Sequence, residues 1–210
     1  MPKAEKKRQE ILDAAIYRFS HLGVAKTTMA EIAADLSISK ASLYYYYADR
    51  NSLFAAVFER ITGDVAANIN AQIAQGLGTD PYKAMEYVLD TRIAFLTKHY
   101  KLLAGLQAYR NEFPEAIQEA INRGREQELS IIRRILAAAT ENGTLRIENI
   151  EETTNMFFYA IVGMRFAVLQ MAKIEFFPTQ EEFDRILVLQ KKLVVIMLDG
   201  LATAPKSAKR

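Results

Sequence analysis

The chain has 210 residues, 50% of them apolar, which is enough to bury a core as one domain or as a small domain joined to a larger one. It has no cysteine, which excludes disulfides, thiolate metal sites and cysteine nucleophiles, and only His21 and His99 supply imidazoles. It has no apolar run of about 18 residues and no signal-like N-terminus, so we expect a cytoplasmic protein with no membrane association.

The net charge of +2 is unevenly distributed. Residues 1–60 carry 9 Lys or Arg against 7 Asp or Glu, residues 61–202 carry 15 against 18, and residues 203–210 carry 3 against none. This division suits a small anion-binding head on a larger, mildly acidic body. We expect residues 204–210 to form a disordered basic tail.

The N-terminal part of the sequence predicts helices with clear start and stop signals. Apolar residues recur at helical spacing over 5–22, and Gly23 is a natural stop. Thr28 and Glu31 form a capping box that opens a second, short helix. A third short helix is predicted after the cap at Ser39.

The rest of the sequence continues the helical pattern. A cap at Asp49 opens a long helix, and the later helices, apart from a short one over 102–110, begin at a proline or at a capping pair of residues. We therefore predict an all-α fold of about nine helices with no strand. The predicted helices after the fourth are 81–100, 102–110, 114–142, 150–173 and 180–201.

Four consecutive tyrosines lie on the third helix. Leu43 and Tyr47 share nearly one face and are expected to pack inward, which leaves Tyr44, Tyr45 and Tyr46 on the surface. Phenol rings beside small polar residues and helix N-termini suit phosphate binding. Two short helices joined by a tight turn also match the helix-turn-helix motif, whose second helix enters the DNA major groove. The alternative is an ordinary core edge or a protein interface.

The stretch TTMAEIAADLSISKASLYYYYADRNSLFAAVFERI, about residues 27–61, resembles the DNA-binding region of the TetR family of bacterial transcriptional regulators. The resemblance implies a three-helix DNA-binding head over 1–50 and a helical effector-binding and dimerisation domain over 51–203. The DNA contacts that it implies are Thr28, Lys40, Ala41, Ser42, Tyr44, Tyr45, Tyr46 and Arg50.

The sequence departs from the pattern of this family at four positions. Ser37 replaces a common turn glycine, so a residue with a Cβ has to adopt an unfavourable backbone conformation. Ala41 stands where glycine is frequent. Tyr47 replaces a phenylalanine and adds a hydroxyl that needs a partner. Arg50 replaces a lysine and can serve a phosphate equally well.

The last two helices are candidates for a homodimer interface, because a head of this size reads one half-site and a two-fold dimer reads a palindromic operator. Ala160, Gly163 and Ala167 form a line of small residues, and the final helix has apolar residues at helical spacing. In the family these helices form a four-helix bundle between subunits; the alternative is an internal core. The candidate interface residues are Ala160, Gly163, Ala167, Phe183, Leu187, Val194 and Leu198.

Arg165 stands out in an apolar run, where an unpaired buried charge would be costly. It can point outward, pair with an acid across the interface, or serve an acidic ligand as counter-ion, and we favour the first two. The resemblance also implies an effector pocket in the middle of the chain. The candidate pocket residues are Phe95, Leu106, Tyr109, Phe113, Phe157 and Met164.

These observations favour a transcriptional regulator, most simply a repressor that a small apolar or amphipathic effector releases from its operator. The sequence shows no phosphate loop, no nucleophile elbow and no paired histidines, so we expect no enzymatic activity, no cofactor and no metal. The alternative is a helical carrier of small molecules or a protein-interaction module without specific DNA binding.

Overall fold

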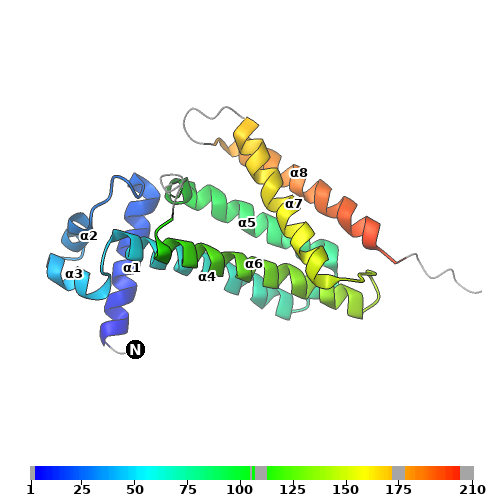
Figure 1. The fold of residues 1–210 in the computed structure, drawn as a ribbon, viewed down its shortest axis with the longest axis horizontal. Coiled ribbons are helices and arrows are strands. Elements are labelled where there is room, and N and C mark those ends of the chain that lie inside the picture. Colours follow the sequence, from blue (N-terminus) through cyan, green and yellow to red (C-terminus); the bar gives the residue numbers. More distant parts are fainter. Residues whose placement is uncertain (1–2, 105, 107–112, 172–177, 204–210) are drawn as a thin grey trace, which may run out of the picture. The chain divides into compact units, whose positions relative to one another are not determined.

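The computed structural model describes residues 3–104, 106, 113–171 and 178–203. Within these residues the regular structure is helical, apart from one isolated bridge between Leu145 and Ala202 (Figure 1). This confirms the prediction of an all-α fold. The helices are α1 (Lys3–Leu22), α2 (Met29–Asp35), α3 (Lys40–Tyr46), α4 (Arg50–Ala74), the 3-10 helix η1 (Leu77–Thr79), α5 (Pro81–Ala104), α6 (Glu115–Glu141), α7 (Ile150–Met171) and α8 (Gln180–Leu201).

The predicted capping signals determine where several of these helices begin. At α2 the backbone N–H of Thr28 donates to Oε2 of Glu31 at 2.8 Å, and the N–H of Glu31 donates to the Thr28 hydroxyl at 3.3 Å. Thr179 and Glu182 make the same reciprocal pair at α8, at 2.7 and 3.3 Å. Each pair satisfies donors that the first turn of a helix would otherwise leave unpaired.

One predicted helix boundary is wrong. The sequence suggested separate helices over 81–100 and 102–110, whereas α5 continues to Ala104 through a kink at His99, where φ is −110° and ψ is 15°. His99 and Leu102 are both buried, so packing on either side of the kink holds the chain in one interrupted helix. Residues 107–110 of the predicted helix lie outside the described residues. The described part of the chain therefore contains eight α-helices.

The chain divides into two compact units. One comprises residues 1–64 and 95–125, and the other comprises residues 65–94 and 126–210. The predicted domain ranges 1–50 and 51–203 stay a prediction about where independently folding parts begin and end. The predicted tail over 204–210 lies outside the described residues.

The core of the first unit forms around the short helices α2 and α3. Leu43 is fully buried and Tyr47 almost so, as predicted, although α3 ends at Tyr46 and Tyr47 follows it with an extended backbone. The rings of Phe19 on α1 and Phe54 on α4 meet edge to face, with centroids 5.8 Å apart. Further buried members of this core are Ile11, Ile32, Leu53, Val57, Leu102 and Ile117.

The core of the second unit includes the packed pair α7 and α8 (Figure 1). Gln190 on α8 is buried, and its Nε2 donates to the backbone carbonyl of Ile161 on α7 at 2.8 Å. None of the described helices combines the length and the apolar character that crossing a bilayer requires. Buried members of this core include Met85, Leu89, Ile132, Ile135, Phe157, Val194 and Leu198.

Candidate functional site

The candidate site is built on α2, the turn that follows it, and α3. In the turn the N–H of Ser37 donates to the carbonyl of Ala34 at 3.0 Å, and Ser37 has a φ of +52°. The strained conformation expected from the missing glycine is therefore present. The Ser39 hydroxyl then accepts the N–H of Ser42 at 3.0 Å and caps α3, as predicted.

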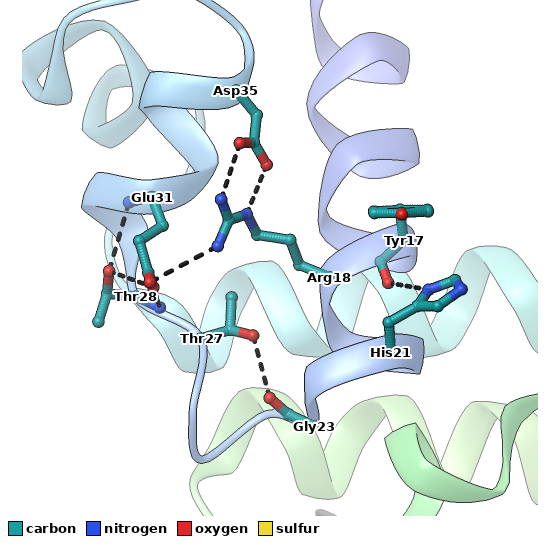
Figure 2. Close-up of polar contacts among 8 residues, drawn as sticks. All are labelled: Tyr17, Arg18, His21, Gly23, Thr27, Thr28, Glu31 and Asp35. Atoms are coloured by element: carbon teal, nitrogen blue, oxygen red, sulfur yellow. Dashed lines mark hydrogen bonds and ion pairs between the residues drawn. The ribbon is translucent and has the colours of Figure 1, made fainter.

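Arg18 on α1 fixes the position of α2 (Figure 2). Its Nη2 donates to Oδ1 of Asp35 at 2.7 Å, its Nε donates to the other oxygen of the same carboxylate, and its Nη1 lies 3.6 Å from Glu31. This hydrogen-bonded guanidinium lowers the pKa of Asp35. Sequence reasoning missed this bidentate pair, because no local pattern links residues on two different helices.

The loop between α1 and α2 is held by its own side chains (Figure 2). The buried Thr27 hydroxyl donates to the carbonyl of Gly23 at 3.0 Å, and Gly23 ends α1 with a φ of +82°. His21 Nδ1 lies 2.7 Å from the carbonyl of Tyr17. The loop therefore presents α2 in a defined orientation.

Thr28, a predicted phosphate contact, already uses its donors within the protein. Its hydroxyl donates to Oε2 of Glu31 at 2.7 Å, and its backbone N–H donates to the same oxygen. These hydrogen bonds lower the pKa of Glu31. A phosphate at this position would have to share or displace the Glu31 carboxylate.

Most of the predicted contact residues on α3 reach the surface. Lys40 and Ala41 are exposed and Ser42 is partly buried. Tyr44 is 47% exposed and Tyr45 is 83% exposed. The structure therefore brings a cation and two phenol hydroxyls together on a helix of two turns.

Tyr46 differs from the expectation that three phenol rings lie on the surface. It is partly buried and packs against the core of the first unit. Its ring lies edge to face with that of Tyr45, with the ring centroids 5.3 Å apart. The reason is geometric, since Tyr46 lies three residues after the buried Leu43 and shares part of its face. Its role as a DNA contact stays a prediction.

Tyr47 lies beside Arg8 of α1, which is a candidate partner for its hydroxyl. Burial raises the pKa of this phenol, while the charge of Arg8 on α1 and a hydrogen bond to it act in the opposite direction. The Arg8 guanidinium carbon lies 5.6 Å from the ring centroid, within the range of a cation–π contact.

The start of α4 closes the candidate surface. Nη1 of Arg50 lies 3.5 Å from the carbonyl of Val24, and the side chain is partly buried. The Asp49 carboxylate caps α4 by accepting the N–H of Ser52 at 2.7 Å and its hydroxyl at 2.6 Å. These hydrogen bonds lower the pKa of Asp49. The carboxylates of Glu31, Asp35 and Asp49 are thus each bound to donors of the protein.

The predicted pocket residues that the structure describes belong to both units, and their assembly into one pocket stays a prediction. Phe95, Leu106 and Phe113 are partly buried and pack against the core of the first unit. Phe157 is fully buried in the core of the second unit, and Met164 is partly buried on α7. Tyr109 lies outside the described residues.

The predicted interface residues divide between the inside and the outside of the second unit. Phe183, Val194 and Leu198 are buried in the chain itself, because they lie on the inner face of α8, and Leu187 packs against that core. These four side chains are therefore occupied by contacts within the chain. By contrast, Gly163 and Ala167 are exposed on α7 and Ala160 is partly buried.

The outer face of α7 and α8 carries large apolar side chains that sequence reasoning missed. On α7 successive exposed apolar residues are three and then seven positions apart. On α8 two of them follow the first one after seven and eight positions. Such spacings place each set on one side of its helix. That spacing was a usable signal, but the inner face of α8 has the same period. The exposed residues are Met156, Tyr159, Phe166, Val188, Val195 and Ile196.

Arg165 is partly buried on α7, near Glu128 on α6 and Arg92 on α5. An acid that interacts with Arg165 is thus present in the same chain, whereas one of the three sequence-based alternatives placed that acid across an interface. Over the residues that the structure describes, no group of three His, Cys, Asp or Glu side chains could hold a metal ion.

Two family models match this chain in different parts. Residues 11–57 match the model of bacterial regulatory proteins of the tetR family. Residues 92–190 match the model of the C-terminal domain of AefR-like transcriptional repressors. Together the two ranges cover more than half of the chain, and the first contains α2, the turn and α3.

Similar proteins of known sequence cover only part of this chain. The HTH-type transcriptional regulator AcrR of Shigella flexneri is 35% identical over 57 residues, 27% of this chain and 26% of that protein. The nucleoid occlusion factor SlmA of Haemophilus influenzae strain PittGG is 28% identical over 125 residues, 57% of this chain and 56% of that protein. The matched segments thus span between about a quarter and about half of these relatives.

Solved structures match over nearly the whole length. A transcriptional regulator from Cytophaga hutchinsonii has a TM-score of 0.79 at 25% identity, and the match covers 94% of this chain and 99% of the other. A putative TetR-family regulator from Mesorhizobium loti has a TM-score of 0.77 at 19% identity, with 97% and 100% coverage, which shows the common fold.

Proposed function

Because this chain belongs to the TetR family of bacterial regulatory proteins, we propose that it is a transcriptional regulator that binds a specific DNA sequence through α3. The observation that carries the proposal is the capped α2–turn–α3 unit, which exposes Lys40, Tyr44 and Tyr45 on one short helix. A helix presented in this way fits the major groove.

The exposed residues suggest how DNA would be held. The Lys40 ammonium is suited to a phosphate or to the acceptor edge of a guanine, and the hydroxyls of Tyr44 and Tyr45 can donate to phosphates. Arg18 supports the surface indirectly, because its ion pairs with Asp35 and Glu31 offset part of the negative charge of these two carboxylates on α2.

The proposed active form is a homodimer that reads a palindromic operator. The outer face of α7 and α8 supports this, because exposed apolar side chains on two adjacent helices favour burial against a second copy. Gly163 and Ala167 lie on the exposed side of α7 and would allow close helix approach. Val188, Val195 and Ile196 replace the inward-facing residues of α8 in this proposed interface.

Repression relieved by a small-molecule effector is the proposed mode of regulation. The C-terminal match to AefR-like repressors supports it, and so does a relative described as a probable acrEF/envCD operon repressor, which is 26% identical over 96 residues in Escherichia coli K12. An effector acts if it binds more tightly to the state with lower operator affinity.

Footprinting on the protein's own upstream intergenic DNA tests this proposal. We expect a protected segment with two-fold symmetry, whose half-sites lie about one helical turn apart, roughly 10 base pairs. The Lys40→Ala, Tyr44→Ala double variant should lose the footprint. As a matched control, Lys83→Ala removes an exposed lysine of α5 and should retain it. Protection that is equally strong in both variants would contradict the assignment of α3.

A further inference from the structure

The second unit contains a charged cluster with an excess of positive charge. Nε of Arg92 on α5 lies 3.7 Å from Oε1 of Glu128 on α6, and the two side chains are only 13% and 17% exposed. Burial lowers the pKa of Arg165 on α7, the charge of Glu128 raises it, and the charge of Arg92 lowers it further, so Arg165 interacts electrostatically with both residues. The cluster thus combines two guanidinium groups with one carboxylate, which is paired with Arg92.

The hydrogen bonds of this cluster are incomplete. Nε and Nη2 of Arg92 are buried and have no hydrogen-bond partner within the described structure. The ion pair with Glu128 is too long to supply one. Arginine does not release its proton in proteins, so the excess charge is best balanced by an added anion.

The surroundings of the cluster are apolar. One helical turn away from each charged residue, on the same face of its helix, lies an aliphatic side chain that is buried in the core of the second unit. An anion bound by the arginines would therefore have hydrocarbon beside it. These side chains are Val88 on α5, Ile132 on α6 and Ile161 on α7.

We propose that Arg92 and Arg165 bind the carboxylate of an organic acid whose apolar body packs against these aliphatic side chains. The planar guanidinium forks match the two oxygens of a carboxylate, and Glu128 holds Arg92 in place while leaving the excess charge unbalanced. This inference rests on the proposed function, because it names the chemical class of the effector. Arg165 then serves as counter-ion to an acidic ligand, whereas the sequence favoured the other two roles together.

Calorimetric titration of the full-length protein tests the ligand class. The probes are decanoate and 4-phenylbutanoate, each paired with its neutral alcohol, decan-1-ol or 4-phenylbutan-1-ol, and acetate as a carboxylate without an apolar body. We expect at least one acid to bind at least about tenfold more tightly than its alcohol and than acetate, as hydrogen bonds to charged groups predict. No binding by either acid, or equal binding by acid and alcohol, would overturn the proposal. Equal binding of acetate would reduce the site to one for any small anion.

Three variants test the residues, and the expected affinity for the acid falls in one, rises in the second and stays unchanged in the third. Arg165→Gln should weaken binding of the acid by at least about tenfold. Glu128→Gln removes the competing carboxylate and should strengthen binding, a result that a merely structural role would not produce. Arg185→Gln makes the same change as the first variant at an exposed position on α8 and should bind as the unaltered protein does. Unchanged affinity in Arg165→Gln, with a melting temperature like that of Arg185→Gln, would rule out the assignment.

The outcome remains separable from that of the proposed function, since acid binding and operator binding are measured independently. Acid binding without any effect on operator affinity would preserve the site and refute its role as the effector site. If the protein binds its operator but neither acid, the proposed DNA-binding function stands and the proposed carboxylate site is wrong.

Discussion

Ser37 occupies a backbone conformation that residues with a Cβ rarely adopt, and its side chain is exposed. We predict that Ser37→Gly raises the free energy of unfolding by about 0.5–1 kcal/mol, because glycine removes the backbone strain of the folded state. Part of this stabilisation is offset, since glycine also increases the conformational entropy of the unfolded chain. Ser37→Val should lower it by at least about 1 kcal/mol, since a β-branched residue fits this region worst. Urea unfolding of the three proteins measures both changes. A less stable glycine variant would contradict the strain argument.

His99 is a buried imidazole in the kink of α5, with Nδ1 3.5 Å from the Ser20 hydroxyl on α1. Burial, reinforced by the charge of Lys98, lowers its pKa below the usual 6.5. The unfolded chain then binds the proton more readily than the folded one. The stability contributed by neutral His99 is therefore complete above pH 6.5 and is lost as the pH falls from there through the folded-state pKa.

We predict that His99→Gln flattens the decline of stability between pH 7 and pH 5, roughly the window of histidine titration. Chemical unfolding at a series of pH values provides the comparison. The hydrogen-bonded carboxylates of Glu31, Asp35 and Asp49 have lowered pKa values and contribute at more acid pH, so they do not obscure this window. Parallel pH profiles of the two proteins would show that His99 is not the group responsible.

At the residue scale, the sequence predicts what local chemistry decides. The capping pairs of α2 and α8 are confirmed, because their partners lie three residues apart. The Arg18–Asp35 pair and the Arg92–Glu128 pair escape prediction, because they depend on how separate helices approach each other.

At the scale of a single element, α3 separates tyrosines that stabilise the fold from tyrosines that face outward. We predict that Tyr46→Ala lowers the free energy of unfolding by about 1–2 kcal/mol, because it removes a ring packed on the core. Tyr45→Ala should change stability by less than about 0.5 kcal/mol, since its ring is exposed.

Operator binding supplies the second half of this comparison. Tyr45→Ala should weaken binding by roughly tenfold if its hydroxyl donates to a phosphate. Thermal unfolding and fluorescence anisotropy on the same two variants measure stability and binding side by side. Full operator affinity in Tyr45→Ala would remove this residue from the proposed contacts.

Helical periodicity predicts elements well and their orientation less well. The period of α8 is correct, yet Val194 and Leu198 face the core of their own chain while Val195 and Ile196 face outward. The two faces have similar apolar spacing, and only the packing of α8 on α7 distinguishes them. The kink in α5 could not be predicted for a related reason. A helix that changes direction and a helix that ends both interrupt the helical spacing of apolar residues.

At the scale of the whole molecule, the protein is proposed to dimerise through the outer face of α7 and α8. We predict that Ile196→Glu, which places a charge on a side chain that is 69% exposed, raises the dimer dissociation constant by at least about 30-fold, as loss of an interface hot spot does. Lys83→Glu, an exposed change on α5, serves as the control. Sedimentation velocity over a concentration series measures the dissociation constant. A dimer that survives Ile196→Glu unchanged would place the interface elsewhere.

Whole-molecule features are where prediction from the sequence is weakest. The aromatic residues assigned to one pocket divide between two cores, because residues near position 100 belong to the first unit and those near position 157 to the second. Apolar spacing shows that a residue is buried, and only the three-dimensional arrangement shows in which core. The DNA-binding head was predictable because it is local, contiguous and capped at each step.

The proposed binding of DNA by α3 predicts that operator affinity depends strongly on salt concentration. Anisotropy titrations at several salt concentrations give the slope of log K against log salt for the unaltered protein and for Lys40→Ala. We predict a steep negative slope that becomes shallower by about one unit in the variant, as expected for the loss of one phosphate contact. Slopes that are flat, or identical in the two proteins, would contradict the account and point to a helical carrier or interaction module.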